Sequence, residues 1–162
     1  MIEVMREREM PVAAGDLWPV VSDPARLGDW FDFAEGAEVI EGAAGVGQRR
    51  RMHGSWGKRK SEIDQRVVDW QPPRRLAWEH EAERLDGKPA PRFAAETVFS
   101  IDLEPAGAAS TRVRLTSRQV PASKPRGLVM RVFGTREVGG KLDGSLERLA
   151  QVTSRSRPDS TS

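Results

Sequence analysis

The strongest constraint on the fold of this chain is a helical repeat near its C-terminal end. Apolar and small residues recur alternately four and three positions apart, at Leu128, Val132, Thr135, Gly139, Leu142, Leu146, Leu149 and Thr153. At about 100° per residue these positions fall in one stripe, which is the pattern of an amphipathic helix with a buried face. An unbroken helix over residues 128–153 would be about 39 Å long. A helix of that length requires a wide apolar surface beneath it.

The N-terminal half of this predicted helix differs from an ordinary packing helix. The run LVMRVF at residues 128–133 is apolar almost all round, and glycines stand at positions 134, 139, 140 and 144. Each glycine costs a helix roughly 0.5 to 1 kcal/mol relative to alanine. We therefore expect this half to bend or partly unwind, and we expect Gly139 to leave space between the helix and its partner.

The rest of the chain is dominated by strand patterns. Stretches with one apolar face, separated by turn residues, lie at 2–10, 37–41, 48–54, 58–70, 76–80, 97–103 and 113–119. Two short helices are predicted after the first stretch, at 14–21 and from the N-cap Asp23 to about Trp30. Antiparallel strands followed by a segregated helix predict an α+β fold in which one curved sheet packs on one helix.

Composition limits the compartment and the chemistry. A chain of 162 residues, 38% hydrophobic and 31% charged, is typical of one soluble globular domain. No apolar run approaches the roughly 20 residues of a membrane span, and no secretory signal precedes the first strand. The absence of cysteine excludes disulfides and thiolate metal sites, and the cytoplasm is the expected location. Because His53 and His80 are the only histidines, we expect no metal and no cofactor.

Short motifs along the chain carry a family resemblance. In order they are PVAAGDLWPVVSDPARLGDWF at 11–31, GVG at 45–47, VVDWQPPRRL at 67–76, and LEP at 103–105 followed by TRV at 111–113. Together they resemble the START-like helix-grip (SRPBCC) superfamily, particularly its polyketide cyclase/dehydrase and coenzyme Q-binding branch. The resemblance covers residues 1–153 as one domain and leaves 154–162 as a disordered tail.

The resemblance implies a seven-stranded curved antiparallel sheet wrapped around a long C-terminal helix, with an elongated apolar cavity between them. Because members of the superfamily bind lipids, sterols, quinones or polyketides, the fold alone does not decide the function. If the strand faces are assigned correctly, the predicted ligand contacts are Trp30, Phe33, Met52, Ile63, Gln65, Val67, Trp78, His80, Phe99, Leu115, Gln119, Val132, Phe133 and Arg136. The alternative is that these bulky side chains fill the space and leave a solid core.

Two features leave alternatives open. His80 shares a strand face with Leu76 and Trp78, so it either enters the cavity as an acid/base or polar contact, or ends a strand bonded to solvent or a neighbouring strand. The hairpin RRRMHGSWGKRK at 49–60 is the densest positive segment. It either holds nucleic-acid phosphates and stacks a base, or is a charged tip that limits pairing of the sheet.

These observations predict a protein, monomeric or homodimeric, that binds a small hydrophobic or aromatic ligand such as a lipid, quinone or polyketide-like molecule. The expected entrance lies between the glycine-rich half of the long helix and the loop at 30–33. A cofactor-free polyketide cyclase or dehydratase is the first alternative, and no catalytic residue is assigned to it. A ribosome- or RNA-associated module using the basic hairpin is the second, although nucleic acid is not the expected partner.

Overall fold

The computed structural model describes residues 1–91, 94–125 and 134–155. Its elements in chain order are β1 (Ile2–Met10), α1 (Ala14–Val21), the 3-10 helix η1 (Pro24–Arg26), α2 (Leu27–Trp30), β2 (Gly36–Glu41), β3 (Arg49–Trp56), β4 (Arg59–Gln71), β5 (Arg75–Leu85), β6 (Lys88–Pro89), β7 (Ala94–Gly107), β8 (Ser110–Pro121) and α4 (Thr135–Arg155). The LVMRVF run at 128–133 lies outside the described residues, as do residues 156–162 of the predicted tail. Ser154 and Arg155 are part of α4.

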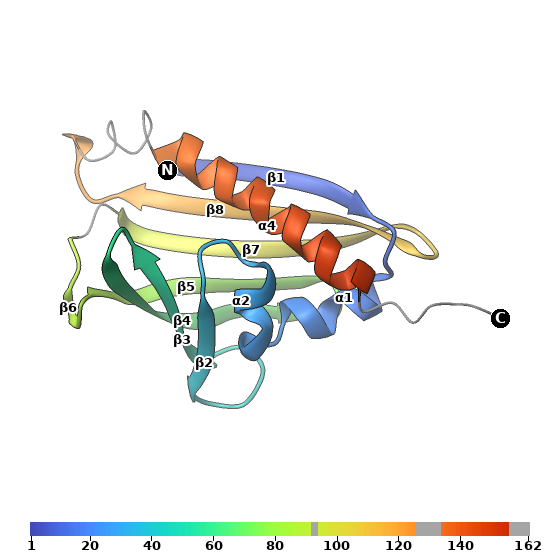
Figure 1. Ribbon diagram of the computed structural model, residues 1–162, viewed down its shortest axis with the longest axis horizontal. Helices are drawn as coiled ribbons and strands as arrows, with labels where there is room; N and C mark the ends of the chain where they lie inside the picture. The colour runs from blue at the N-terminus through green and yellow to red at the C-terminus, as the bar shows by residue number, and fades with distance from the viewer. Residues whose placement is uncertain (92–93, 126–133, 156–162) are drawn as a thin grey trace.

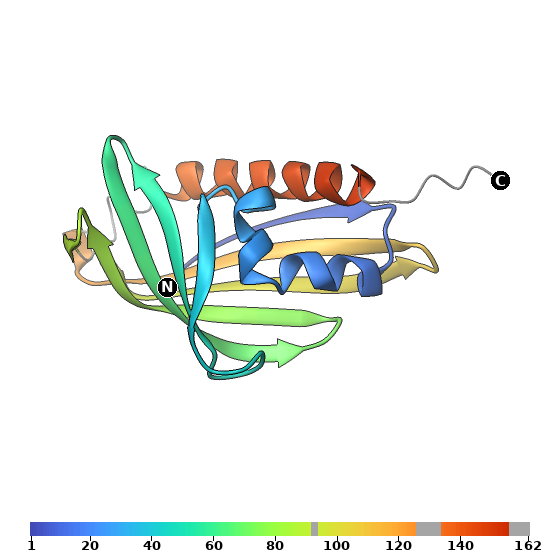
Figure 2. The ribbon, with the colours of Figure 1, turned by 60° about the horizontal axis from the view of Figure 1, so that its bottom comes forward.

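The strands form one antiparallel sheet in the order β1-β8-β7-β5-β4-β3-β2, and the short strand β6 pairs with β5. Among the described strands β1 and β2 are the two edges, so the sheet curves without closing. In Figures 1 and 2, α4 crosses the concave side of the sheet over β1 and β8, and α1 and α2 lie on the same side. The predicted α+β helix-grip architecture is confirmed, with β6 as an addition to it.

The two short helices begin and end as their sequence predicts. α1 covers 14–21 and buries Leu17, Val20 and Val21. Asp23 then caps η1, because its carboxylate accepts a hydrogen bond from the Ala25 amide at 2.9 Å while Pro24 occupies the first position. α2 continues directly to Trp30, and this places the aromatic segment 30–33 against the sheet.

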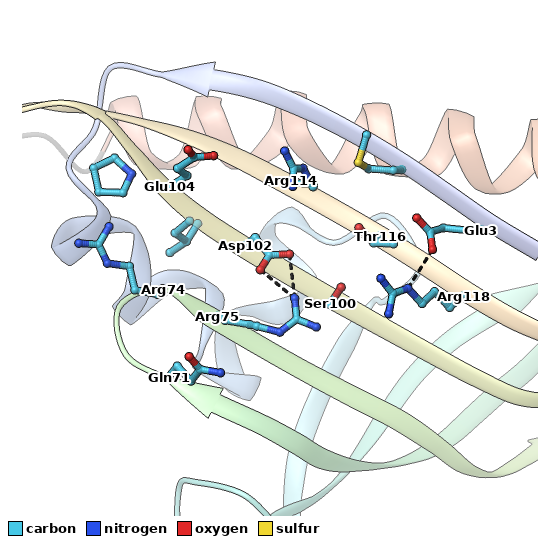
Figure 3. Close-up of a pocket in the computed structure, with 13 residues that line it drawn as sticks. Glu3, Gln71, Arg74, Arg75, Ser100, Asp102, Glu104, Arg114, Thr116 and Arg118 are labelled. Carbon is cyan, nitrogen blue, oxygen red and sulfur yellow. Dashed lines mark hydrogen bonds and ion pairs between the residues drawn. The ribbon is translucent and has the colours of Figure 1, made fainter.

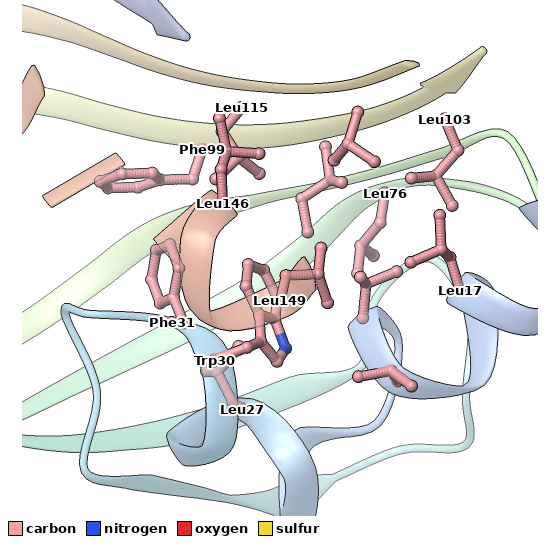
Figure 4. Close-up of a cluster of buried hydrophobic side chains, with 14 of the residues drawn as sticks. Leu17, Leu27, Trp30, Phe31, Leu76, Phe99, Leu103, Leu115, Leu146 and Leu149 are labelled. Atoms are coloured by element: carbon pink, nitrogen blue, oxygen red, sulfur yellow. The ribbon is translucent and has the colours of Figure 1, made fainter. Parts of the chain in front are cut away.

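The core lies between the C-terminal half of α4, the short helices and the concave face of the sheet (Figure 4). Leu142 and Leu149 are fully buried, and Phe99 and Leu115 lie in the same cluster. Phe99, Leu115 and Leu142 therefore share one interior between the sheet and the helix. Full burial of each such side chain contributes about 1.5 to 3 kcal/mol, so this contact is a main source of stability.

Gly139 and Gly144 of α4 allow neighbouring side chains to approach the helix closely. α4 runs unbroken through Gly139, Gly140 and Gly144 (Figure 2), so the predicted unwinding does not occur in the described helix. A Cβ on Gly139 would contact the Arg6 guanidinium, and a Cβ on Gly144 would overlap the Asp32 carboxylate. The expectation that Gly139 opens a space is therefore wrong, because Arg6 occupies that position.

At Gly144 the loop between α2 and β2 is fastened to the helix. The Asp32 amide donates to Ser145 Oγ at 2.8 Å, and Arg148 Nη1 donates to Asp32 Oδ1 at 2.9 Å. Arg148 Nη2 also donates to the Gly28 carbonyl at 2.7 Å. These bonds hold the segment 30–33 beside α4, where Phe33 reaches the pocket described next.

Candidate ligand pocket

A pocket of about 340 Å³ lies between the β3–β4 hairpin, the adjoining ends of β5, β7 and β8, and the first turns of α4. At the helix it is lined by Gly134, which precedes α4, and by Glu137, Val138 and Lys141. These residues are spaced three, one and three positions apart. This spacing defines a helix face next to the buried stripe of Leu142 and Leu146. The pocket therefore lies at the opposite end of α4 from the solid core.

One part of the pocket wall is aromatic. The rings of Phe33 and Phe99 meet edge to face with centroids 5.1 Å apart, and the His80 ring stacks on Phe99 at 5.5 Å with an interplanar angle of 26°. Met52 and Ile63 extend this surface along β3 and β4. Flat aromatic and aliphatic side chains of this kind offer a contact surface to an apolar or ring-shaped ligand.

His80 is the polar group on this wall with the most defined geometry. Its Nδ1 lies 3.0 Å from Glu83 Oε1, and its side chain is only 10% exposed. Because an ionised carboxylate can only accept, Nδ1 carries the hydrogen and Nε2 is the acceptor in a neutral ring. Nε2 is buried and has no hydrogen-bond partner within the described part of the chain. His80 therefore has unused hydrogen-bonding capacity at the pocket wall.

Further polar groups surround the pocket. Thr97 and Gln119 line it from β7 and β8, and Lys141 lies over the Phe33 ring with Nζ 5.2 Å from the centroid. This cation–π contact positions a positive charge at the pocket wall. The wall is thus mixed, with an aromatic side and a set of hydrogen-bonding groups.

Behind the pocket a charged cluster fixes the hairpin to β5. Arg84, which also lines the pocket, and Arg51 each donate to the Asp64 carboxylate at 2.8 Å. The two guanidinium groups, Arg84 first, lower the pKa of Asp64 to about 2 in spite of its burial. The cluster therefore remains ionised at physiological pH and holds β3, β4 and β5 in one arrangement.

The predicted ligand contacts divide into four groups. Those that line the pocket are Phe33, Met52, Ile63, His80, Phe99 and Gln119. Those that are buried in the core away from its wall are Trp30, Gln65, Val67, Trp78 and Leu115. Arg136 is exposed on α4 and is not in the wall, whereas Val132 and Phe133 lie outside the described residues.

Side-chain volume explains this division. Trp30 and Trp78 are fully buried in the hydrophobic core, so their side chains fill interior space that a ligand would otherwise occupy. Gln65 also points inward, but its Nε2 lies 3.4 Å from Met52 Sδ and the residue is almost inaccessible. The remaining space is the end of the concave side that these large residues do not reach.

Sequence reasoning missed several pocket residues. Gly134, Val138 and Lys141 repeat at helical spacing and could have been found as a second stripe, but the charge of Lys141 concealed it. Glu137 is also on α4, and the others come from the β3–β4 hairpin, the end of β5, the β5–β7 connection and the start of β7, whose positions depend on how strongly the sheet curves. They are Gly54, Ser55, Trp56, Ser61, Glu83, Arg84, Leu85, Ala90, Pro91, Ala94 and Thr97.

A second hollow, of about 510 Å³, lies on the outer face of the sheet (Figure 3). Its arginines are largely engaged with carboxylates: Arg75 with Asp102 at 2.8 Å, and Arg118 with Glu3 at 3.0 Å. Because these ion pairs already satisfy the charges, the outer hollow has less to offer a ligand than the aromatic pocket. We take the inner pocket as the candidate site.

The base of the basic hairpin is also engaged in ion pairs. Arg49 contacts Glu41 and Glu81, at 3.1 and 3.2 Å. Arg50 is buried, donates to Gln48 and to the Ser22 carbonyl, and its pKa is lowered by desolvation to about 10. These contacts leave the arginines of β3 little capacity for phosphates, so the base of the hairpin favours the structural alternative over nucleic-acid binding.

A curved antiparallel sheet around a C-terminal helix, with a pocket at one end of the concave side, defines a START-like protein of the helix-grip class. The chain belongs to the family described as polyketide cyclase / dehydrase and lipid transport, whose model matches residues 1–153. No described helix is long and apolar enough to cross a membrane.

Solved structures share this fold at low sequence identity. A protein from Thermus thermophilus is 17% identical with a TM-score of 0.75, over 97% of this chain and 100% of that one. A START superfamily protein from Mycobacterium smegmatis is 12% identical with a TM-score of 0.73, over 96% and 99% of the two chains. The di-domain ARO/CYC BexL from the BE-7585A biosynthetic pathway is 19% identical with a TM-score of 0.73, over 93% of this chain and 46% of that one. None of the curated proteins matches the chain.

Proposed function

We propose that this protein binds a small hydrophobic or aromatic ligand in the pocket between the β3–β4 hairpin and α4. The observation that carries the proposal is the aromatic wall of Phe33 and Phe99 beside His80, whose buried Nε2 has no partner among the described residues. A ligand with an apolar ring and one hydrogen-bond donor fits both parts of this wall. The cytoplasmic location stays a prediction from composition.

The size of the pocket narrows the ligand class. Ligand pockets commonly enclose roughly 300 to 1,000 Å³, and the volume of about 340 Å³ is near the lower limit. A quinone ring or a short polyketide-like ring system fits such a volume better than a complete diacyl lipid. Among the three ligand types expected from the sequence, the ring compounds are therefore favoured.

Binding is tested first with the hydrocarbon dye 1,6-diphenylhexatriene, which has no hydrogen-bond donor and whose fluorescence rises in an apolar site. We expect saturable binding that Val138→Trp weakens more than tenfold by filling the pocket. Arg136→Ala is the matched control on the same helix, because Arg136 is exposed and outside the wall. Equal dye binding by parent and Val138→Trp, with both folded, would locate the site elsewhere.

Identification of the bound compound uses native mass spectrometry of the protein as purified. An extra mass that is lost in Val138→Trp would reveal the ligand retained from the cell. His80→Gln should weaken binding of a hydroxylated ring compound and leave dye affinity within about twofold, because the dye cannot use the Nε2 acceptor.

The His80–Glu83 pair supports a second candidate function, a cofactor-free cyclase or dehydratase. In a β-hydroxy ketone, Nε2 would take a proton from the carbon next to the carbonyl. The carbon–oxygen bond to the hydroxyl would then break and a carbon–carbon double bond would form. The hydroxyl would leave as water by taking the proton that Nε2 had accepted, which returns His80 to its starting form. A general base oriented by a carboxylate suits this step.

Mass spectrometry of a hydroxylated polyketide-like ketone after incubation distinguishes the two candidates. The binding function predicts that the ketone is retained unchanged and that His80→Gln alters affinity only. Loss of water at a rate that falls at least a hundredfold in His80→Gln would establish the dehydratase instead.

A further inference from the structure

The tip of the β3–β4 hairpin carries an exposed tryptophan. Trp56 is 58% exposed although it is a large apolar side chain, and it immediately precedes the turn at Gly57, whose φ is +61°. In Figure 2 this hairpin extends beyond the body of the sheet near the first turns of α4. Trp56 is therefore presented on a projection, where a flat partner can reach it.

Free positive charge is concentrated at the same tip. Lys58, Arg59 and Lys60 are all exposed, and within the described residues neither lysine has a carboxylate within ion-pair distance. Arg59 contacts Asp86 at 3.3 Å, with both side chains more than half exposed. The arginines lower on the hairpin, Arg49 and Arg51, are by contrast held in ion pairs. The tip is the part of the hairpin whose charge is available.

The tip is also part of the pocket rim. Trp56 lines the pocket together with Ala90 and Pro91 from the β5–β7 connection. One aromatic side chain thus faces both the surrounding solvent and the space proposed for the ligand.

We propose that the hairpin tip, Trp56 to Lys60, is a docking surface for an anionic lipid bilayer. Tryptophan favours the boundary between lipid headgroups and acyl chains, where its ring is buried and its N–H is hydrated. Lysines near an anionic surface each strengthen binding about fivefold. A single aromatic with a few cations makes a weak, reversible contact, which suits a protein that visits the membrane.

The geometry favours a bilayer over RNA. A single-stranded nucleic acid needs a series of stacking aromatics along a continuous positive groove. Below the tip, His53 is bonded to Glu38 at 2.9 Å and Arg51 lies between Asp64 and Glu62, so the positive surface does not continue along the hairpin. A planar surface needs only the projecting tip.

Docking here would place the pocket rim at the headgroup layer. An apolar ring compound could then pass between bilayer and pocket without crossing water. This consequence, but not the docking itself, rests on the proposed ligand-binding function.

The test uses sedimentation of the full chain with ligand-free vesicles of phosphatidylcholine, with or without phosphatidylglycerol. We expect binding to the anionic vesicles only, weakened by added salt. Trp56→Ser and the double change Lys58→Glu with Lys60→Glu should each weaken it more than fivefold. The matched control combines Val46→Ser and Arg74→Glu, which remove an exposed apolar residue and an exposed cation from other surfaces and should leave binding unchanged.

Two further measurements keep the outcome clear. Thermal melts establish that each variant is folded. Dye binding in vesicle-free buffer measures ligand binding in the pocket independently, so the docking proposal can be disproved while the ligand-binding proposal is retained. The proposal is overturned if the parent does not sediment with anionic vesicles, if both tip variants bind them as well as the parent, or if single-stranded RNA at the same salt binds the tip more tightly than the vesicles do.

Discussion

At the scale of single residues, Asp64 makes the stability of the folded state depend on pH. Its folded pKa of about 2 lies below the ordinary 3.8, so its ionised form stabilises the folded state. This contribution is complete above about pH 4 and is lost as the pH falls through the folded pKa. At 1.36 kcal/mol per pKa unit it amounts to about 2 kcal/mol.

Asp64→Asn should therefore lower the free energy of unfolding at neutral pH by about 2 kcal/mol or more, because Arg84 and Arg51 lose their shared partner. Urea unfolding at several pH values measures this, and the variant should show a flatter dependence between pH 4 and 2 than the parent. Asp86→Asn is the control, since its pair with Arg59 is exposed and surface ion pairs contribute little to stability. Identical pH profiles for Asp64→Asn and the parent would contradict the assignment.

Two glycines of the same helix should respond in opposite directions to alanine. A Cβ added at Gly140 would meet no described atom within 4 Å, so Gly140→Ala should stabilise by about 0.5 to 1 kcal/mol through helix propensity. Gly144→Ala should destabilise by at least about 1 kcal/mol, because the new methyl would displace Asp32 from Ser145 and Arg148. Thermal melts of the two variants make the comparison, and stabilisation by both would mean that the loop is not fastened there.

At the scale of elements, the contact between sheet and helix is uneven along α4. Phe99 borders the pocket, whereas Leu142 is fully enclosed. Leu142→Ala should lower the free energy of unfolding by about 2 to 5 kcal/mol. Phe99→Ala should lower it by an amount at or below the lower end of the usual range of about 3 to 5 kcal/mol, because a cavity already lies beside Phe99. Chemical unfolding of both variants gives these values. Neutral effects at both positions would exclude the shared interior.

The pairing of the first and last strands offers a second element-scale prediction. Glu7 and Arg114 are cross-strand partners, and Arg114 Nη2 lies 3.1 Å from Glu7 Oε2. A double-mutant cycle of Glu7→Lys and Arg114→Glu should give a coupling of about 0.2 to 1 kcal/mol that shrinks with salt. The cycle at Glu9 and Arg112 is the control, because these partners form no ion pair within the described chain. A coupling no larger at Glu7 than at Glu9 would count against the pair.

At the scale of the whole molecule, periodicity and turn residues were sufficient to predict the order of strands and helices. In most strands the buried side chains lie mainly on one face, which the alternation of apolar and polar residues indicates, whereas β2 has no buried residue. The pocket was predicted less well, because its place depends on which volumes remain after packing. Trp30 and Trp78 lie on the correct faces but fill the interior, whereas Lys141 reaches the pocket from a helix position that its charge would assign to solvent.

The open sheet leaves the outer edge of β1 without a partner strand among the described residues. An exposed edge of this length can recruit a second copy by strand addition. Antiparallel self-pairing centred on Met5 would set Glu3 opposite Glu7. Centring it on Arg6 would oppose two Arg6 side chains, and centring it on Glu7 would oppose two Glu7 side chains. Since like charges directly across a ladder are destabilising, each of these long registers is disfavoured. The alternation of arginine and glutamate thus disfavours pairing of the β1 edge with a second copy of β1. The same alternation favours the pairing of β1 with β8.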